Sequence, residues 1–212
     1  GFANLSDGVV YSNVTTATLN LSGVPSSMND YHYRCITGGC VVNDTSNTVT
    51  LMVNRITVSN TNNSGAGSLR QAIIDANASC VDTIYFDAGI YGQTITLTSG
   101  FIDIYGNLAI IGTGASMTID GNNSDRIFYS NDPVTISLNG LTLRNANSIG
   151  DGGAIYLSGV TSCTINSCVI SGNTSANYGG GVYALNTALT ITKSTFYGNT
   201  AGYGGGIFTD DG

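Results

Sequence analysis

The sequence contains no glutamate and no tryptophan, and it has little charge of either sign. Only 9% of the residues are charged but 42% are hydrophobic, so the chain can build a core and is not a disordered acidic tail. With 13 Asp and six Lys or Arg, the net charge of −7 argues against binding to nucleic acid or to anionic membrane surfaces. The polar residues are mainly Asn, Thr, Ser and Gly, which favours an extracellular location over the cytosol.

The sequence also lacks segments that would insert it into a membrane. No run approaches the roughly 20 apolar residues of a membrane span. The sequence has no initiator Met and no charged-then-apolar leader, so we expect a mature or excised piece of a protein that continues beyond it.

The five cysteines match no zinc-binding spacing. Cys35 and Cys40 flank a short "ITGG" loop between two expected antiparallel strands, where facing residues lie within disulfide range, so we predict a disulfide between them. Cys163 and Cys168 are both expected to face inward, which leaves open either two buried core thiols or a second bridge. Cys80 has no obvious partner.

A repeat organises most of the chain. The stretches "TINSCVISGNT" (164–174) and "TITKSTFYGNT" (190–200) align at an offset of 26 residues. Glycine clusters recur with nearly the same period, as "GGAIY" from Gly152, "GGGVY" from Gly179 and "GGGIF" from Gly204. Repeats of this length are typical of stacked architectures, in which one unit cannot bury its core alone.

Each period contains three short β-type runs separated by turn residues. Alternation in Thr94-Ile95-Thr96-Leu97 turns one side chain inward and the next outward. We therefore predict an all-β fold from residue 80 onward, a parallel β-helix with three strands per turn and about five turns. The expected strands are 82–86, 94–97, 101–104, 108–111, 117–120, 126–129, 134–138, 141–143, 154–157, 163–165, 169–171, 181–184, 189–191, 195–197 and 206–208.

The recurring glycine clusters are interpreted as corners of this coil. Sharp turns and close backbone approach favour Gly and Asn. A phosphate-binding loop is the competing interpretation, but no Lys-Ser/Thr follows and no helix begins there.

Residues 65–79 form the one convincing helix. Ser68 and Gln71 make an S-x-x-Q capping box, and Leu69, Ala72 and Ile73 begin an apolar face. We expect this helix to lie across the first turn and shield its interior.

Residues 1–54 lack the repeat and are predicted to be the C-terminal part of an immunoglobulin-like β-sandwich, with 55–64 as a linker. Alternating runs span 15–24, 30–37 and 47–54. Tyr33 stands two residues before Cys35, the spacing of a tyrosine corner in such sandwiches.

These stretches also resemble known proteins. "SGAGSLRQAIIDANAS", "DTIYFDAG" and "IDIYGNLAIIGTGASMTIDGNN" resemble right-handed parallel β-helix domains of large secreted Bacteroidota-type surface adhesins. Gly-Gly-Ala-Ile at 152–155 and Phe-Tyr-Gly-Asn at 196–199 are similar to the repeats of chlamydial polymorphic outer-membrane proteins. "YSNVTTATLNLSGVPSSMNDYHYRCITGGC" is similar to immunoglobulin-like modules that precede such helices. The resemblance implies export, often by the type IX secretion route and its machinery, and a role in adhesion or surface structure.

An enzyme of the pectate lyase or polygalacturonase type is the alternative. Glycosidase chemistry needs two carboxylates about 5–10 Å apart, and a lyase would use Arg126 or Arg144 beside Asp-bound calcium. The acidic candidates are Asp103, Asp120, Asp125 and Asp151. None belongs to an adjacent acidic pair, and a catalytic triad would need His32, the single histidine, which we expect on the surface. We therefore expect no catalytic residue.

If the chain binds a ligand, we expect uncharged tyrosine side chains to make the contacts. Tyr156, Tyr183 and Tyr197 fall near corners and could stack on sugar rings, or simply pack over bare glycine backbone. Asp-Gly pairs leave structural calcium open, although none follows the nonapeptide period of calcium coils. We expect no other cofactor or metal. The sequence thus predicts a non-catalytic, extracellular cell-surface segment that binds a glycan or a host or substratum ligand, or acts as a stalk.

Overall fold

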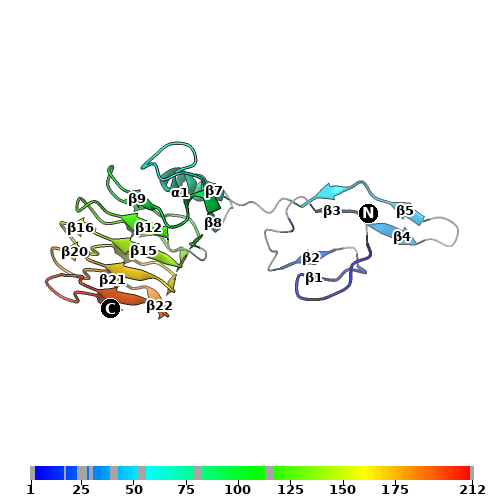
Figure 1. The fold of residues 1–212 in the computed structure, drawn as a ribbon. Coiled ribbons are helices and arrows are strands. Elements are labelled where there is room, and N and C mark those ends of the chain that lie inside the picture. Colours follow the sequence, from blue (N-terminus) through cyan, green and yellow to red (C-terminus); the bar gives the residue numbers. More distant parts are fainter. Residues whose placement is uncertain are drawn as a thin grey trace. The chain divides into compact units, whose positions relative to one another are not determined.

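The computed structural model describes residues 3–16, 18–22, 28, 31–38, 43–51, 56–78, 83–112 and 117–210 (Figure 1). The chain divides into two compact units, residues 1–55 and 56–212. This division falls next to the boundary expected after residue 54.

The first unit consists of short antiparallel strand pairs. The pairs are β1 (Tyr11–Ser12) with β2 (Asn20–Leu21), β3 (His32–Tyr33) with β6 (Val49–Thr50), and β4 (Ile36–Gly38) with β5 (Asn43–Thr45). His32 is exposed, and its Nδ1 lies 3.0 Å from Oγ1 of Thr50.

The tyrosine corner predicted at Tyr33 takes a different form. A tyrosine corner places the phenol hydroxyl against upstream backbone, but the hydroxyl of Tyr33 lies 3.1 Å from that of Tyr11, and the two rings meet edge to face. Partial burial and this contact raise the pKa of Tyr33 to about 12.

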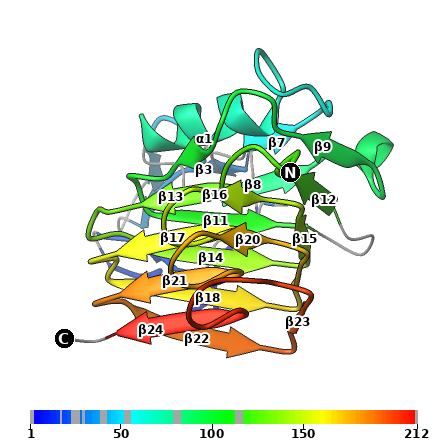
Figure 2. The same ribbon diagram turned by 90° about the vertical axis from the view of Figure 1, so that its left-hand side faces the viewer.

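The second unit is a parallel β-solenoid of about six turns (Figure 2). Its six-stranded sheet contains β7 (Ile56–Val58), β8 (Thr83–Phe86), β11 (Leu108–Ile111), β14 (Thr135–Asn139), β18 (Ser162–Asn166) and β22 (Ala188–Thr192). A five-stranded sheet contains β10 (Ile102–Asp103), β13 (Phe128–Ser130), β17 (Ile155–Ser158), β21 (Val182–Leu185) and β24 (Ile207–Asp210). The other five-stranded sheet contains β9 (Thr94–Thr96), β12 (Met117–Asp120), β15 (Leu141–Arg144), β19 (Val169–Ser171) and β23 (Thr195–Tyr197).

The core forms because the period-two pattern repeats in register from turn to turn. Ile110 pairs with Ile84 on one side and with Leu138 on the other, and Leu138 pairs in turn with Ile165. All four side chains are buried. Parallel pairing in register therefore stacks like side chains into continuous inner columns, which confirms the parallel solenoid predicted from the repeat.

Glycine forms the corners, as predicted. Gly152, Gly179 and Gly204 all have φ between +63° and +67°, a region that favours glycine. Close approach adds a second reason, because a Cβ on Gly153 would lie 1.9 Å from the carbonyl oxygen of Gly180 in the next turn.

An asparagine ladder links the last turns. Asn173 is fully buried, and its Nδ2 donates to the carbonyl of Leu143 and to Oδ1 of Asn199 at 3.1 and 2.9 Å. Its own Oδ1 accepts from the backbone N–H of Ala146 at 3.0 Å. Asn173 thereby hydrogen-bonds backbone groups of the preceding turn from inside the core.

The predicted cap is present as α1 (Leu69–Asn77), with Ser68 as its N-cap. Leu69, Ala72, Ile73 and Ala76 are buried in the solenoid core. Half of the predicted capping box forms: Oγ of Ser68 accepts from the backbone N–H of Gln71, whereas the Gln71 amide donates to Asp75 instead of the N-cap.

Some elements differ from the sequence-based prediction. All the strands predicted after residue 80 occur, with ends shifted by up to two residues. The expected linker 55–64 instead contributes β7, which pairs with β8. This additional strand gives the sheet six strands, so the solenoid has about six turns where about five were predicted. A short parallel pair, β16 (Asn147–Ser148) with β20 (Thr174–Ser175), was not predicted. Each of these strands has only two residues, which is too short for an alternation of buried and exposed side chains to be recognised in the sequence.

Candidate functional site

An aromatic column runs along the outer face of the sheet that contains β10 and β24. Its members, called the aromatic column below, are Phe101, Tyr129, Tyr156, Tyr183 and Phe208. The strand register builds it, because Tyr129 pairs with Tyr156 and Tyr183 pairs with Phe208 in parallel strands. Successive ring centroids lie 4.9–5.6 Å apart.

The rings in this column mostly cover one another's faces. Tyr129 and Tyr156 stack at an interplanar angle of 9°, Tyr156 and Tyr183 at 18°, and Tyr183 and Phe208 at 5°. Tyr183 is buried. Faces that are already stacked are not available to a sugar ring, so the column presents mainly ring edges to solvent.

Arg126 sits against the first rings of the column. Its guanidinium carbon lies 5.7, 5.6 and 5.2 Å from the centroids of Phe101, Tyr129 and Tyr156, within the range of cation–π attraction. The side chain is only 14% exposed. Its Nε is buried without a hydrogen-bond partner among the described residues, and lies 3.8 Å from Oδ1 of Asp125.

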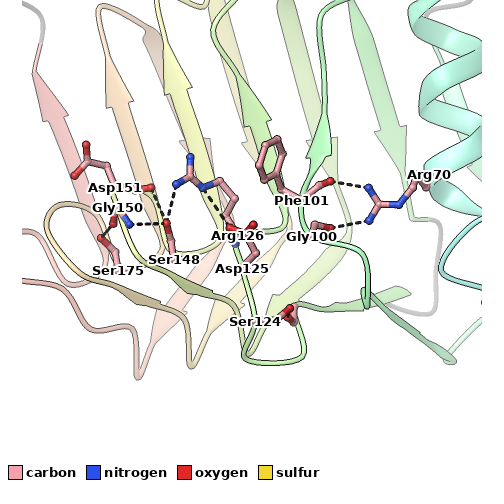
Figure 3. A network of polar contacts seen from close by, with 11 residues as sticks. Arg70, Gly100, Phe101, Ser124, Asp125, Arg126, Ser148, Gly150, Asp151 and Ser175 are labelled. Carbon is pink, nitrogen blue, oxygen red and sulfur yellow. Dashed lines mark hydrogen bonds and ion pairs between the residues drawn. The ribbon is translucent and has the colours of Figure 1, made fainter.

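A loop of the next turn completes the surroundings of Arg126 (Figure 3). Its Nη2 donates to Oγ of Ser148 at 2.8 Å, and Ser148 accepts a further bond from the N–H of Gly150 at 3.2 Å. Ser175, one turn further on, donates to the carbonyl of Gly150 at 2.9 Å. Arg126 therefore joins the aromatic column to the loop of the next turn, and Ser175 joins that loop to the turn after it.

Arg70 plays a comparable role at the cap. From α1 it donates to the carbonyls of Gly100 and Phe101 at 2.7 and 2.6 Å (Figure 3). The column thus begins where the helix is fastened to the first turns.

A second, shorter stack flanks the far end of the column. Tyr178 stacks on Tyr203 with their ring centroids 5.3 Å apart. Its centroid also lies 4.7 Å from that of Phe208 and 6.5 Å from that of Tyr183. The backbone N–H of Tyr178 donates to Oδ1 of Asp151 at 3.3 Å. Burial, followed by the charges of Asp151 and other neighbours, raises the pKa of Tyr183.

The tyrosines predicted to stack on sugars lie in two places. Tyr156 and Tyr183 belong to the aromatic column. Tyr197 is on β23 of another sheet and is 61% exposed. Sequence reasoning missed Phe101, Tyr129 and Arg126 as members of the same cluster, although the shared phase of the aromatic residues after each glycine corner could have indicated the column.

The acidic and basic candidates for catalysis make local contacts. Asp120 pairs with Arg144 at 3.0 Å and also accepts from Asn122 N–H at 2.9 Å, as a turn residue does. Asp125 accepts from the N–H of Arg126 at 2.8 Å. The pKa of Asp103 is raised by partial burial, with a smaller contribution from the charge of Asp132.

Two cysteines described in the solenoid are free thiols. Cys163 and Cys168 are buried, and Cys168 Sγ lies 3.3 Å from the carbonyl oxygen of Asn166. Of the two alternatives, the buried-thiol interpretation therefore matches the structure, and the second bridge does not form. Burial, with the charge of Cys168, raises the pKa of Cys163 to about 12.

The other cysteine predictions fall partly outside the described residues. Cys35 is exposed, but its predicted partner Cys40 lies outside them, as does Cys80. Within the described part of the chain, there is no cluster of three or more His, Cys or Asp side chains that could hold a metal ion. None of the helices described is long and apolar enough to cross a membrane.

Comparison with known proteins gives a family match for the last turns of the solenoid. Residues 167–185 and 193–210 match the Chlamydia polymorphic membrane protein (Chlamydia_PMP) repeat. The protein is a parallel β-helix with chlamydial-PMP-like repeats. The two matches contain the asparagines of the ladder and the corner glycines Gly179 and Gly204, so the matched repeat includes residues that shape these turns. No curated protein matches the chain.

Proposed function

We propose that this chain is a non-catalytic segment of a large extracellular cell-surface protein, and that the solenoid acts as a stalk or in adhesion. The observation that carries the proposal is the match of the last turns to a repeat of polymorphic membrane proteins. Backbone pairing, the asparagine ladder and the aromatic column also join these turns along the coil. Such contacts extend a structure along one axis, as a stalk requires.

Finer features of the proposal come from the sequence analysis. The short runs in each period predict three strands per turn, and the alternating runs of residues 1–54 predict an immunoglobulin-like first unit. A right-handed coil and export by the type IX route are implied by the resemblance given above. Among the two roles, the stalk fits the geometry better, because stacking within the column occupies the ring faces that a glycan would use.

Surface display is tested with antibodies raised against residues 56–212. We expect equal labelling of intact and permeabilised cells of the source organism, with a periplasmic protein as the control for leakage. Labelling that appears only after permeabilisation would contradict the proposal.

The role is tested on the purified chain. A stalk gives no retention on glycan arrays or immobilised matrix proteins, whereas an adhesive segment is retained by a specific ligand. Polygalacturonate and pectate are assayed in parallel with Asp120→Asn and Asp151→Asn. Depolymerisation that either variant abolishes would replace the proposal with the enzyme alternative.

A further inference from the structure

Tyr129 and Tyr156 are two phenols that the strand register holds face to face. They are direct partners in the parallel pairing of β13 with β17 (Figure 2). Their ring centroids lie 4.9 Å apart at an interplanar angle of 9°, which makes them the closest and most nearly parallel tyrosine pair among the described residues. Since β13 also pairs with β10, and β17 with β21, both rings belong to interior turns of the solenoid.

The rings on either side of this pair are less suited to oxidation. Phe101 has no hydroxyl group, and Tyr183 is buried. Burial raises the pKa of Tyr183, so its phenol gives up a proton less readily. Tyr129 and Tyr156 are only half-buried, and because stacking covers their faces, it is the ring edges that meet solvent. These two are therefore neighbouring phenols that can both release a proton to water.

Arg126 holds both rings from one side. Its guanidinium carbon lies 5.6 and 5.2 Å from the centroids of Tyr129 and Tyr156, and its Nη2 donates to Oγ of Ser148. A phenol and the phenoxyl radical formed from it by loss of one electron and one proton are both neutral. The adjacent positive charge therefore positions the rings without a large electrostatic cost to radical formation.

We propose that Tyr129 and Tyr156 are an oxidative cross-linking site, at which a one-electron oxidant joins neighbouring turns of the solenoid through a dityrosine bond. Each phenol gives one electron to an oxidant molecule and one proton to water. The two radicals couple through one Cε carbon of each ring, and the hydrogen on each of these carbons then moves to the phenolic oxygen of its own ring. Two tyrosines and two oxidant molecules thus give one dityrosine, two protons and two reduced oxidant molecules.

The bond staples one turn to the next. It closes a loop between residues 129 and 156, which restricts the unfolded chain and so stabilises the folded one. This modification goes beyond the proposed stalk or adhesive role. It is tested on the purified chain, so its failure leaves the test of surface display untouched.

The test exposes the dilute purified chain to tris(bipyridine)ruthenium(III), generated by a flash of light in the presence of persulfate. The monomer is isolated, unfolded and digested with trypsin. Tyr129 is the single tyrosine of peptide 127–144, and Tyr156 lies in peptide 145–193. We expect mass spectrometry to find these two peptides joined, with the loss of two hydrogens, and fragmentation to place the link on Tyr156.

Substitutions that keep the rings identify the reacting phenols. Tyr129→Phe and Tyr156→Phe should each abolish the joined peptides. Tyr183→Phe and Tyr197→Phe should leave their yield unchanged. Thermal unfolding of each variant before oxidation verifies that the fold is kept. Oxidation should also raise the urea midpoint of the native chain more than that of Tyr156→Phe, because only the native chain gains this link.

Four results would each overturn the proposal. One is the absence of the joined peptides after oxidation of the native chain. Another is a link from peptide 127–144 that maps to Tyr178 or Tyr183. The third is a yield that survives Tyr156→Phe, and the fourth is an equal rise of the urea midpoint in the native chain and in this variant.

Discussion

Arg126 combines two properties that are rarely found together on a protein surface. Its charge is largely buried, yet the carboxylate paired with it, that of Asp125, lies 3.8 Å away, and its main described neighbours are three aromatic rings and Ser148. Burying a charge without a strong ion pair is costly unless other groups offset the lost hydration. The rings and the serine hydroxyl provide that compensation, so we expect Arg126 to stabilise the fold through packing and cation–π attraction.

Replacing this side chain should therefore destabilise the solenoid. Arg126→Ala should lower the free energy of unfolding by about 2 kcal/mol, the range for a desolvated cation–π contact, as measured by urea denaturation. The matched control is Arg144→Ala, which removes a 44% exposed arginine from its ion pair with Asp120 and should cost about 0–1 kcal/mol. Equal effects of the two substitutions would show that the rings contribute nothing.

Asn173 should be similarly sensitive, for a different reason. Asn173→Ala leaves the Leu143 carbonyl and the Ala146 N–H without their side-chain partner in the core, and we expect a loss of about 2–4 kcal/mol. Asn166→Ala removes only an exposed contact with Thr192 and should change the free energy of unfolding by less than about 0.5 kcal/mol. Denaturant midpoints of the two variants check this difference.

The raised pKa of Tyr183 links stability to alkaline pH. The fold favours the neutral phenol, so the unfolded chain releases this proton at lower pH, near the ordinary value of 10.0. The stabilisation is therefore complete below about pH 10 and is lost as the pH rises through the folded value. Urea midpoints should fall as the pH rises above about 10, and Tyr183→Phe should reduce this fall. An unchanged pH dependence in the variant would assign the effect to other tyrosines.

At the scale of the element, the cap α1 matters because the first turn has apolar residues on its open side. Four of its residues are buried in the core, and two polar side chains tie it to the following turn. Arg70 donates to the backbone near Phe101, and Asn77 donates to the carbonyl of Asp103 at 3.0 Å and accepts from the N–H of Gly106 at 3.1 Å. The helix is thus part of the solenoid's core and not an appendage.

Two adjacent isoleucines of α1 offer a matched test of this interpretation. Ile73 is fully buried, whereas Ile74 is 46% exposed. Ile73→Ala should cost about 2–5 kcal/mol because it leaves a cavity, and Ile74→Ala less than about 0.5 kcal/mol. If thermal or urea unfolding gives the same stability for both, the helix does not seal the core.

At the scale of the whole solenoid, stability should vary along the coil. Each central turn pairs with two neighbours, whereas β22, β23 and β24 each pair with one strand in the structure. In a solenoid, stability is approximately a sum of nearest-neighbour terms. Hydrogen exchange on this chain should therefore be slowest in β14, β15 and β17 and faster in β22 and β23. Uniform protection would indicate that the whole solenoid opens as one unit.

The sequence alone determined the repeat, the strands after residue 80, the parallel stacking, the glycine corners and the cap. These features follow from local signals: an apolar side chain at every second position, glycine where φ is positive, and an apolar helix face after a capping serine. A repeat makes such local patterns easier to recognise, because the same pattern occurs in several turns.

Only the tertiary structure decided which side chains meet. Arg126 contacts Phe101, Tyr156 and Ser148, which come from different turns and lie up to 30 positions away in the sequence. Tyr156 and Tyr183 have their faces covered by neighbours, while Tyr197, in a similar sequence context, stays exposed on another sheet. The same holds for β7, whose three residues become a strand only by pairing with β8. The physical reason is that the register between turns sets these contacts, and register is a property of the assembled coil, not of any one segment.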